Sequence, residues 1–425
     1  MKKLFIPILM VLMVFGISGF TFGGGFLIYE HGAAAMAQAG AFVARTYDPT
    51  AIFHNPAGIA WLDGTQISVG TTLIVPKGSL ELPNYSLLDP TWPGSVDQEG
   101  QIFYPSTFYI THRFNDKISF GLGFFSPFGL GTEWPEDFPL RYISYKTSMK
   151  TFYINPTVAY QVNENFSIGA GVSYIYADIE FKHYSMAALP MPPWTLDYGV
   201  SLEGKDSFAI GFNAGLLYKD ENWSVGSSYR SRATLNLEGD VIIDPPAGWE
   251  FLFPETEMKG STDMHLPDIF TVGGAYEATD KLVVEVDVQY NIWSVYDKLV
   301  LEVEGQEDQE IEQDWDNAFI FRIGGEYQLN ENLALRAGVL YDPTPQPVKS
   351  MDSSLPDANR WAFTAGLGYK KNNFTIDFAY QFEPFNDRES PNRDIYDVPL
   401  LGINFGEGTY STTAHLFGIS IGYIF

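Results

Sequence analysis

The feature that most constrains the fold is a repeated hairpin, in which two alternating segments flank a short polar turn. The clearest copies are YQVNENFSIGAGVSY at 160–174 and YQLNENLALRAGVLY at 327–341. Similar turns occur at 115–117, 220–222, 279–281 and 371–373. The six turns join twelve predicted strands. A further alternating segment at each end, 64–75 and 409–425, raises the predicted number of strands to fourteen.

Within these segments the side chains alternate with the period of two that a β-strand requires. In the segment 282–292, Leu282 and Val284 share one face, whereas Glu285 and Asp287 share the other. The apolar faces end in aromatic residues, short turns alternate with long loops, and the polar faces carry Gly and charges of both signs, as in a membrane barrel. An open sheet edge cannot lie in lipid, so the strands must close. The predicted fold is all-β, a 14-stranded antiparallel transmembrane barrel.

The composition excludes several classes of protein. Aromatic residues make up 16% of the chain, and the formal net charge is −27. Nucleic acid is excluded as a partner, because its binding requires a basic surface. The absence of cysteine excludes disulfides and thiol chemistry. The segment 302–316 holds eight carboxylates and no Lys or Arg. We interpret it as a solvated acidic loop, with a divalent-cation site as the alternative.

Residues 1–23 have the pattern of a secretory signal peptide. Two lysines precede the apolar segment 4–20, and small residues follow, so we expect cleavage after Gly23. No later run of about eighteen apolar residues predicts a transmembrane helix. The chain ends on Phe425, which resembles the terminal aromatic signature of bacterial outer-membrane barrels. We therefore expect a monomeric, multi-pass protein of the bacterial outer membrane, in contact with its lipid and lipopolysaccharide.

Residues 24–63 do not alternate, and they lie between the signal peptide and the first strand. Pro49 and Pro56 prevent any long element there. A barrel of fourteen strands is too wide to be filled by its own side chains. We therefore predict that 24–63 forms a small, partly helical hatch inside a barrel formed by 64–425.

This organisation resembles the FadL family, the long-chain fatty-acid and hydrocarbon transporters of bacterial outer membranes. The strongest match is Asn55-Pro56-Ala57-Gly58 in the hatch, and GLGFFSPFGLGTEWP at 121–135 resembles the third strand of that family and the loop after it. The resemblance covers essentially the whole mature chain. It implies a passive transporter for long-chain fatty acids or similar hydrophobic compounds, which works without a cofactor and releases its substrate either past the hatch or through a lateral opening in the wall.

In that family a kink in the third strand opens the wall sideways. The corresponding segment here contains Ser126-Pro127, and Pro interrupts a β-ladder because it has no N–H group to donate. The two preceding glycines would remove side chains from the lumen face. The alternative is an ordinary strand end, with the proline marking a loop. The residues predicted to form the lateral opening are Gly121, Gly123, Ser126, Pro127 and Phe128.

Two long loops are apolar enough to capture a hydrophobic molecule from outside. Exposed apolar loops of this size usually mark a binding site, and flexible Met with rigid aromatic residues suits chains of varied shape. The alternative is that the loops only pack against each other. Together with the N-terminal hatch residues that the resemblance places in the pocket, the predicted substrate-binding residues are Phe26, Leu27, Met186, Leu189, Met191, Trp194, Trp249, Phe251 and Phe253.

Arginines on the polar faces are candidates for binding a carboxylate head group, because a guanidinium can donate to both carboxylate oxygens. Arg230 and Arg232 share the polar face of the segment 223–237 and are predicted to face the lumen, with Arg322 and Arg336 behind them. The rival interpretation is that most of these arginines pair across the lumen with carboxylates, for which the candidates are Glu285, Asp287, Glu326 and Asp377.

No sequence motif indicates catalysis. The six histidines form no HExxH pattern and no local pair of metal ligands, and nothing selects a catalytic set of side chains. We therefore predict neither enzyme activity nor a cofactor or metal. Two other functions remain as alternatives. One is a general porin for polar solutes, which requires an open lumen, and the other is a surface receptor or adhesin that uses the barrel as a scaffold.

Overall fold

The computed structural model describes residues 24–83, 85, 91–189, 195–253, 255–389, 397–398, 403–404 and 408–425. The predicted signal peptide, 1–23, and two of the predicted loop residues, Met191 and Trp194, lie outside the described residues.

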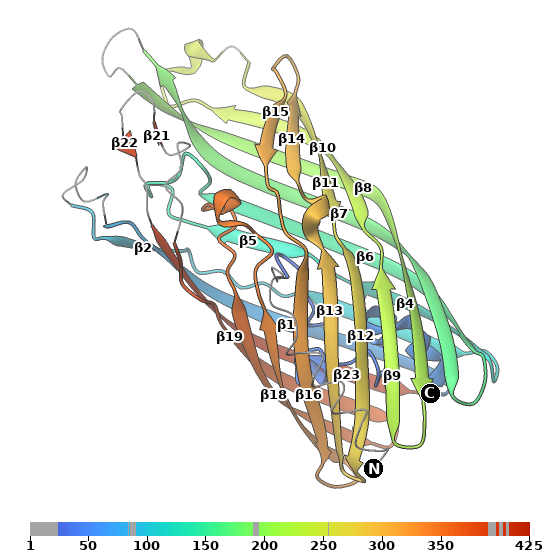
Figure 1. Cartoon of the computed structure of the whole chain (residues 1–425). Helices are drawn as coiled ribbons and strands as arrows, with labels where there is room; N and C mark the ends of the chain where they lie inside the picture. Colours follow the sequence, from blue (N-terminus) through green and yellow to red (C-terminus); the bar gives the residue numbers. More distant parts are fainter. Residues whose placement is uncertain are drawn as a thin grey trace.

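Fourteen antiparallel strands form the wall, and each pairs with the next along the chain. The last strand pairs with the first from Gln66–Ile424 to Glu81–Thr409, so the sheet closes on itself and the predicted barrel is confirmed (Figure 1). The wall strands are β1 (Thr65–Glu81), β3 (Ser106–Arg113), β4 (Ile118–Phe125), β6 (Lys146–Gln161), β7 (Phe166–Ala188), β8 (Thr195–Lys219), β9 (Trp223–Arg230), β12 (Asp268–Thr279), β13 (Leu282–Ile292), β16 (Ala318–Gln328), β17 (Leu333–Asp342), β18 (Arg360–Lys371), β19 (Phe374–Pro384) and β23 (Thr409–Ile424).

The six predicted polar turns connect consecutive wall strands at one end of the barrel, and the long connections lie at the other end (Figure 1). In two of the turns Asn115 and Asn163 each accept two backbone N–H groups through Oδ1, which explains the recurring Asn. The remaining elements outside the hatch are β2 (Ser95–Asp97), β5 (Gly129–Glu133), β10 (Ala233–Asp244), β11 (Glu257–Leu266), β14 (Lys298–Val303), β15 (Gln309–Glu312), β20 (Arg388–Glu389), β21 (Asp397–Val398), β22 (Ile403–Asn404), η4 (Glu250–Leu252), η5 (Trp293–Val295) and η6 (Val348–Ser350).

The wall is apolar outside and polar inside, the reverse of a soluble protein. On β8, Phe212 is 53% exposed whereas its neighbour Asn213 is 2% exposed. On β23, Phe417 is exposed and Ser420 is buried. This arrangement suits a wall surrounded by lipid. Among the described residues, no helix is long and apolar enough to cross a membrane.

The hatch lies inside the barrel (Figure 1). It contains α2 (Ala33–Met36), which packs on β18, β19 and β23, then α3 (Ala51–His54), and η2 (Pro56–Trp61), which packs on β6, β7 and β8. Wall side chains satisfy much of its irregular backbone: Ser420 accepts from the Ala33 N–H group at 2.9 Å, and Ser224 donates to the Ala44 carbonyl at 2.7 Å. Non-helical backbone is tolerated at membrane depth only when it is enclosed in this way.

Glycines on the lumen face let the hatch approach the wall closely. A Cβ added at Gly169 would lie 2.4 Å from the carbonyl carbon of Pro56, and one at Gly215 would lie 2.1 Å from Asn55 Oδ1. Both distances are far below van der Waals contact, so no larger residue fits at these positions. Part of the high glycine content therefore follows from the presence of the hatch.

The seventh wall strand, β9, continues as β10 along the same neighbour, β8, and the chain changes face between the two. β9 ends at Arg230 and β10 begins at Ala233, and the side-chain alternation shifts across the two residues between them. Arg232 donates its backbone N–H group to Asp268 Oδ1 at 2.9 Å, and its side chain is 57% exposed. The prediction that Arg232 faces the lumen beside Arg230 is therefore wrong, because the interruption breaks the period of two on which it was based.

Candidate functional site

The third strand of the wall is interrupted at Ser126–Phe128, a segment that we call the kink. Before the kink, β4 pairs with β3 as far as Phe124 and with β6 as far as Phe125. After it, β5 pairs with β6 from Gly129 onwards, but no pairing with β3 resumes among the described residues. Pro127 has no N–H group, which explains why the ladder stops here.

The N-terminal end of the hatch pairs with the kink. The Ile28 N–H group donates to the Pro127 carbonyl at 2.8 Å, and the Gly129 N–H group donates to the Phe26 carbonyl at 3.1 Å. Between these bonds Leu27 and Phe128 form an isolated antiparallel bridge. The hatch thus supplies backbone partners on the inner side of the kink, which couples its first residues to the break in the wall.

A cavity of about 750 Å³, the kink cavity, lies at this break. Its lining includes Tyr29 and Glu30 of the hatch, which are buried inside the barrel. The same lining includes Phe124 of β4 and Phe152 of β6, which are 36% and 37% exposed. Because buried hatch residues and exposed wall residues line one cavity, the space extends from the interior toward the outside of the barrel. Phe26, Leu27, Ser126 and Phe128 also line it.

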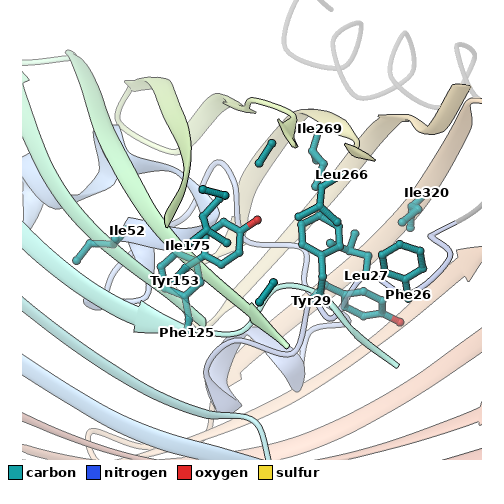
Figure 2. Packing of buried hydrophobic residues seen from close by; sticks show 14 of the residues in the cluster. Phe26, Leu27, Tyr29, Ile52, Phe125, Tyr153, Ile175, Leu266, Ile269 and Ile320 are labelled. Atoms are coloured by element: carbon teal, nitrogen blue, oxygen red, sulfur yellow. The ribbon is translucent and has the colours of Figure 1, made fainter. Parts of the chain in front are cut away.

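An aromatic cluster surrounds Phe26 next to the kink cavity. The ring of Phe26 lies 4.8 Å from that of Trp293, 5.7 Å from that of Trp315 and 6.1 Å from those of Tyr296 and Phe128, measured between centroids. Figure 2 shows Phe26 beside Leu27 and Tyr29. Sequence reasoning missed both tryptophans. One signal was available, since Trp315 is the single aromatic residue in the acidic segment 302–316.

The inner side of the kink cavity is acidic and tightly hydrogen-bonded. Glu383 Oε1 accepts from the Tyr29 hydroxyl at 2.9 Å and from Gln381 Nε2 at 2.6 Å. The same amide nitrogen donates to Glu30 Oε1 at 2.8 Å. The carboxylates are therefore held in place by fixed donors.

The motif Asn55-Pro56-Ala57-Gly58 fastens the hatch to the wall. Asn55 Nδ2 donates to the Val43 carbonyl at 2.8 Å and to the Leu216 carbonyl of β8 at 3.0 Å, and its Oδ1 accepts from the Ala57 N–H group at 3.1 Å. The first and third bonds lie within the hatch, and the second reaches the wall. Gly58 packs against Thr46, since a Cβ added to it would lie 1.9 Å from Thr46 Oγ1.

Two wall carboxylates hold another part of the hatch. Asp287 Oδ2 accepts from the N–H groups of Phe42 and Val43 at 2.9 and 3.1 Å, and Glu285 Oε1 accepts from the Ala44 N–H group at 2.7 Å. Neither carboxylate is within ion-pair distance of an arginine among the described residues. Of the carboxylates weighed as arginine partners, these two bind hatch amides instead.

The remaining carboxylate candidates do pair with an arginine. Arg336 Nε lies 2.7 Å from Glu326 Oε2, and its Nη1 lies 2.5 Å from Asp377 Oδ1. Arg45 of the hatch also pairs with Glu326. Arg336 thus pairs with both carboxylates, as the rival interpretation predicts for most of the arginines.

Arg230 differs from these paired arginines. It is 7% exposed, it stacks over the rings of Phe53 and Phe125 at 5.0 and 5.2 Å, and its Nη2 donates to the Phe53 carbonyl at 3.2 Å. Arg232, by contrast, pairs with Asp268 at 2.7 Å outside the lumen. Of the two predicted head-group residues, only Arg230 lies inside the barrel.

The other predicted site residues are dispersed. Gly121 and Gly123 face the hatch, and a Cβ on either would lie within 3.0 Å of Ile52. Met186 belongs to β7, and Leu189 follows that strand. None of the described residues predicted in the two apolar loops lines the kink cavity. In the β10–β11 connection, the rings of Trp249 and Phe251 stack at 6.0 Å and Phe253 packs on Tyr198 at 4.9 Å.

The acidic segment 302–316 forms the end of a hairpin made by β14 and β15. Lys298 pairs with Glu310 there at 2.9 Å, and the carboxylates are exposed. Within the described ranges, no group of three or more His, Cys, Asp or Glu residues is arranged to hold a metal ion.

Comparison with known proteins identifies the family of this barrel. A sequence model of the family described as outer membrane protein transport protein (OMPP1/FadL/TodX) matches residues 14–425. The chain belongs to this family. It is accordingly a protein of the bacterial outer membrane, and the resemblance noted in the hatch and third strand reflects membership of the FadL family.

Relatives of this FadL-family barrel match it over most of their length. The long-chain fatty acid transport protein of Escherichia coli O6:H1 is 24% identical over 404 residues, which cover 87% of this chain and 89% of that protein. A Pseudomonas aeruginosa FadL homologue matches with a TM-score of 0.81 and 20% identity over 94% of this chain and 99% of that one. The toluene transporter TodX of P. putida matches with a TM-score of 0.72 and 16% identity over 93% of this chain and 99% of that one. At these identities the two structures show a shared fold.

Proposed function

We propose that this protein is a passive outer-membrane transporter for long-chain fatty acids or similar hydrophobic compounds. The observation that carries the proposal is the kink cavity. It joins the hatch residues Phe26 and Leu27 to exposed residues of the wall at the third wall strand, where the pairing with β3 ends at Pro127. A relative named as a long-chain fatty acid transporter and a structural neighbour named as a toluene transporter support this class of substrate.

In the proposed route an apolar molecule is captured by the extracellular loops, in which Phe251 is 73% exposed. It then enters the barrel and passes the aromatic cluster around Phe26. It leaves through the kink cavity into the lipid of the outer membrane. Each step moves the molecule between apolar surroundings, so transport down a gradient requires no cofactor, nucleotide or catalysis.

The hatch supports lateral release over a vertical, water-filled path. Asn55, Asp287 and Glu285 fix it to several strands of the wall. A second cavity between the hatch and the wall, lined by Val43, Pro56 and Arg230, is about 50 Å³. We propose that a monomer suffices, since both the cavity and the plug belong to one chain.

The test is uptake of labelled oleate and labelled hexadecane by cells that carry the gene, lack it, or carry it on a plasmid. The proposal predicts that deletion lowers uptake of at least one compound and that the plasmid restores it. Unchanged uptake of both compounds after deletion would contradict the proposal. Planar bilayers provide a control, because a general porin would show large steady conductance.

A further inference from the structure

The chain that leads into β3 follows the wall as the segment 98–105, which we call the strap. The Phe103 N–H group donates to the Ile74 carbonyl at 2.9 Å, and the Ile74 N–H group donates to the Phe103 carbonyl at 2.8 Å. The Thr72 N–H group donates to the Pro105 carbonyl at 3.1 Å. The strap therefore extends the pairing between β1 and β3 and is held in place by β1.

The opposite edge of the strap faces β5 with little backbone pairing. Among the described residues, one backbone hydrogen bond joins the two, from the Glu99 N–H group to the Glu133 carbonyl at 2.8 Å, at the last residue of β5. In the same part of the structure no ladder pairs the strap with 129–132, and both edges line the kink cavity. The wall is therefore open between these two edges, and we call this opening the slot.

The side chain of Phe103 crosses the slot. Its ring lies against the backbone of Gly131 in β5, since a Cβ added at Gly131 would lie 2.1 Å from Cζ and 2.4 Å from Cε1 of Phe103. Only a glycine leaves room for the ring in this position. The flanking residues Ile102 and Tyr104 are 62% and 71% exposed, whereas Phe103 is half-buried. The ring therefore fills the space between the two edges while its neighbours face outward.

This closure is made by a side chain and not by a β-ladder. The hydrogen bonds of the Phe103 backbone go to β1, so a change of its χ1 rotamer moves the ring away from Gly131 without breaking them. Rotamer changes are much faster than collective movements of strands. The slot can therefore open and close while the wall on either side keeps its hydrogen bonds.

We propose that Phe103 and Gly131 form a side-chain gate that sets the cross-section of the hydrophobic molecules leaving the kink cavity. The proposal rests on the proposed function, which it deepens by naming a residue that determines substrate width. An unbranched hydrocarbon chain is narrow and passes beside the rotated ring. A fused-ring hydrocarbon needs the volume that the ring occupies, so the gate discriminates against it by steric exclusion.

The first experiment measures uptake of labelled hexadecane and labelled pyrene, with the uptake of the deletion strain subtracted. Phe103→Ala is expected to raise pyrene uptake about tenfold and to change hexadecane uptake less than about twofold, because only the wide molecule must displace the packed ring. The matched control is Phe108→Ala, which should change neither. Phe108 belongs to β3, is 38% exposed and does not line the kink cavity.

A second variant tests the contact from the other side of the slot. The added methyl group of Gly131→Ala occupies the place of the ring, and the three atoms nearest to it all belong to Phe103. Gly131→Ala is therefore expected to raise the ratio of pyrene to hexadecane uptake in the wild-type background and to leave it unchanged in the Phe103→Ala background. This dependence on the ring distinguishes a gate from a general loosening of the wall.

The third measurement does not require transport. The chain contains no cysteine, so Ser126→Cys places a single thiol in the lining of the kink cavity. The purified protein in lipid vesicles is labelled with N-ethylmaleimide or with N-(1-pyrenyl)maleimide. The gate predicts that adding Phe103→Ala accelerates the pyrenyl reagent about tenfold and the ethyl reagent less than about twofold, for the same steric reason.

Equal acceleration of both reagents, or of neither, would overturn the gate. An unchanged ratio of pyrene to hexadecane uptake in Phe103→Ala cells would overturn it as well, provided that wild-type cells take up hexadecane. If wild-type cells take up neither hexadecane nor oleate, the proposed function fails, while the two labelling rates still decide whether Phe103 closes the slot.

Discussion

Single residues of the hatch carry several contacts at once, and Asn55 is the clearest case. Its amide links the hatch loop at Val43, the start of η2 at Ala57 and the wall at Leu216. Replacement by Ala leaves buried backbone groups unpaired, each at a cost of ~1–3 kcal/mol. The wall has its own closed ladder, so the loss falls on the hatch and not on the barrel.

We therefore predict that Asn55→Ala folds as a barrel but leaks. Antibiotic sensitivity and single-channel conductance should both rise relative to wild type, while heat-modifiable migration in gels stays normal. Asn373→Ala, which changes an exposed turn residue of the same type, is the matched control. Wild-type conductance and wild-type substrate uptake in the Asn55 variant would contradict the role assigned to this residue.

At this scale the sequence predicts some partners and not others. The sequence neighbourhood of Asn55, between a signal peptide and the first strand, was enough to place it in the hatch. Trp293 and Trp315 were missed because their contact with Phe26 joins segments far apart in the chain. Local periodicity reports which face a residue occupies, but it does not report what lies opposite.

Among the elements, the third strand shows what a sequence pattern can predict and what it cannot. Pro127 predicts that a ladder ends, and the structure shows that it does. That the first residues of the hatch would pair with the kink from inside was not predictable, because the Leu27–Phe128 bridge joins segments about a hundred residues apart. For the seventh strand the prediction was wrong, because the alternation in the sequence does not indicate the change of face before Arg232.

The loop between β17 and β18 contains a titratable group at the kink cavity. Asp357 is buried there, and its Oδ2 accepts from the Thr344 hydroxyl at 2.5 Å. Burial raises the pKa of Asp357 from its ordinary value of 3.8 to about 6. The folded-state pKa is raised, so protonated Asp357 favours the folded loop. This contribution to loop stability is complete below pH 3.8 and is lost as the pH rises through about 6.

We predict that amides of the loop 343–359 are better protected from hydrogen exchange at pH 5 than at pH 7, after correction for intrinsic rates. Asp357→Asn should remove this difference, because the amide cannot ionise. The matched control is Asp352→Asn in the same loop, which should keep it. Equal protection of the wild-type loop at both pH values would count against a proton bound at Asp357.

For the whole molecule, counting hairpins was sufficient to predict the architecture. Six turns and two terminal strands gave the closed wall, since lipid forbids an open edge and the turns all lie at one end. The need for a hatch followed from the width of fourteen strands. What counting could not supply was the position of the cavities, which depends on how the side chains of 24–63 fill the lumen.

The central claim is that a hydrophobic molecule leaves through the wall between the hatch and the kink. Leu27 and Phe128 form an antiparallel bridge, and the hydrogen bonds lie on either side of this pair rather than between its two residues. In such a non-hydrogen-bonded pair the Cα atoms lie about 4.5 Å apart, which is close enough for a disulfide. The chain contains no cysteine, so Leu27→Cys with Phe128→Cys introduces the only pair of thiols.

The most direct measurement is uptake of the compound identified as substrate by cells expressing this double variant, first oxidised and then reduced, with each single variant as control. The account predicts that oxidation blocks uptake and that reduction restores it, while both single variants respond to neither treatment. Equal uptake in the oxidised and reduced states, with the disulfide shown to be formed, would contradict release at the kink.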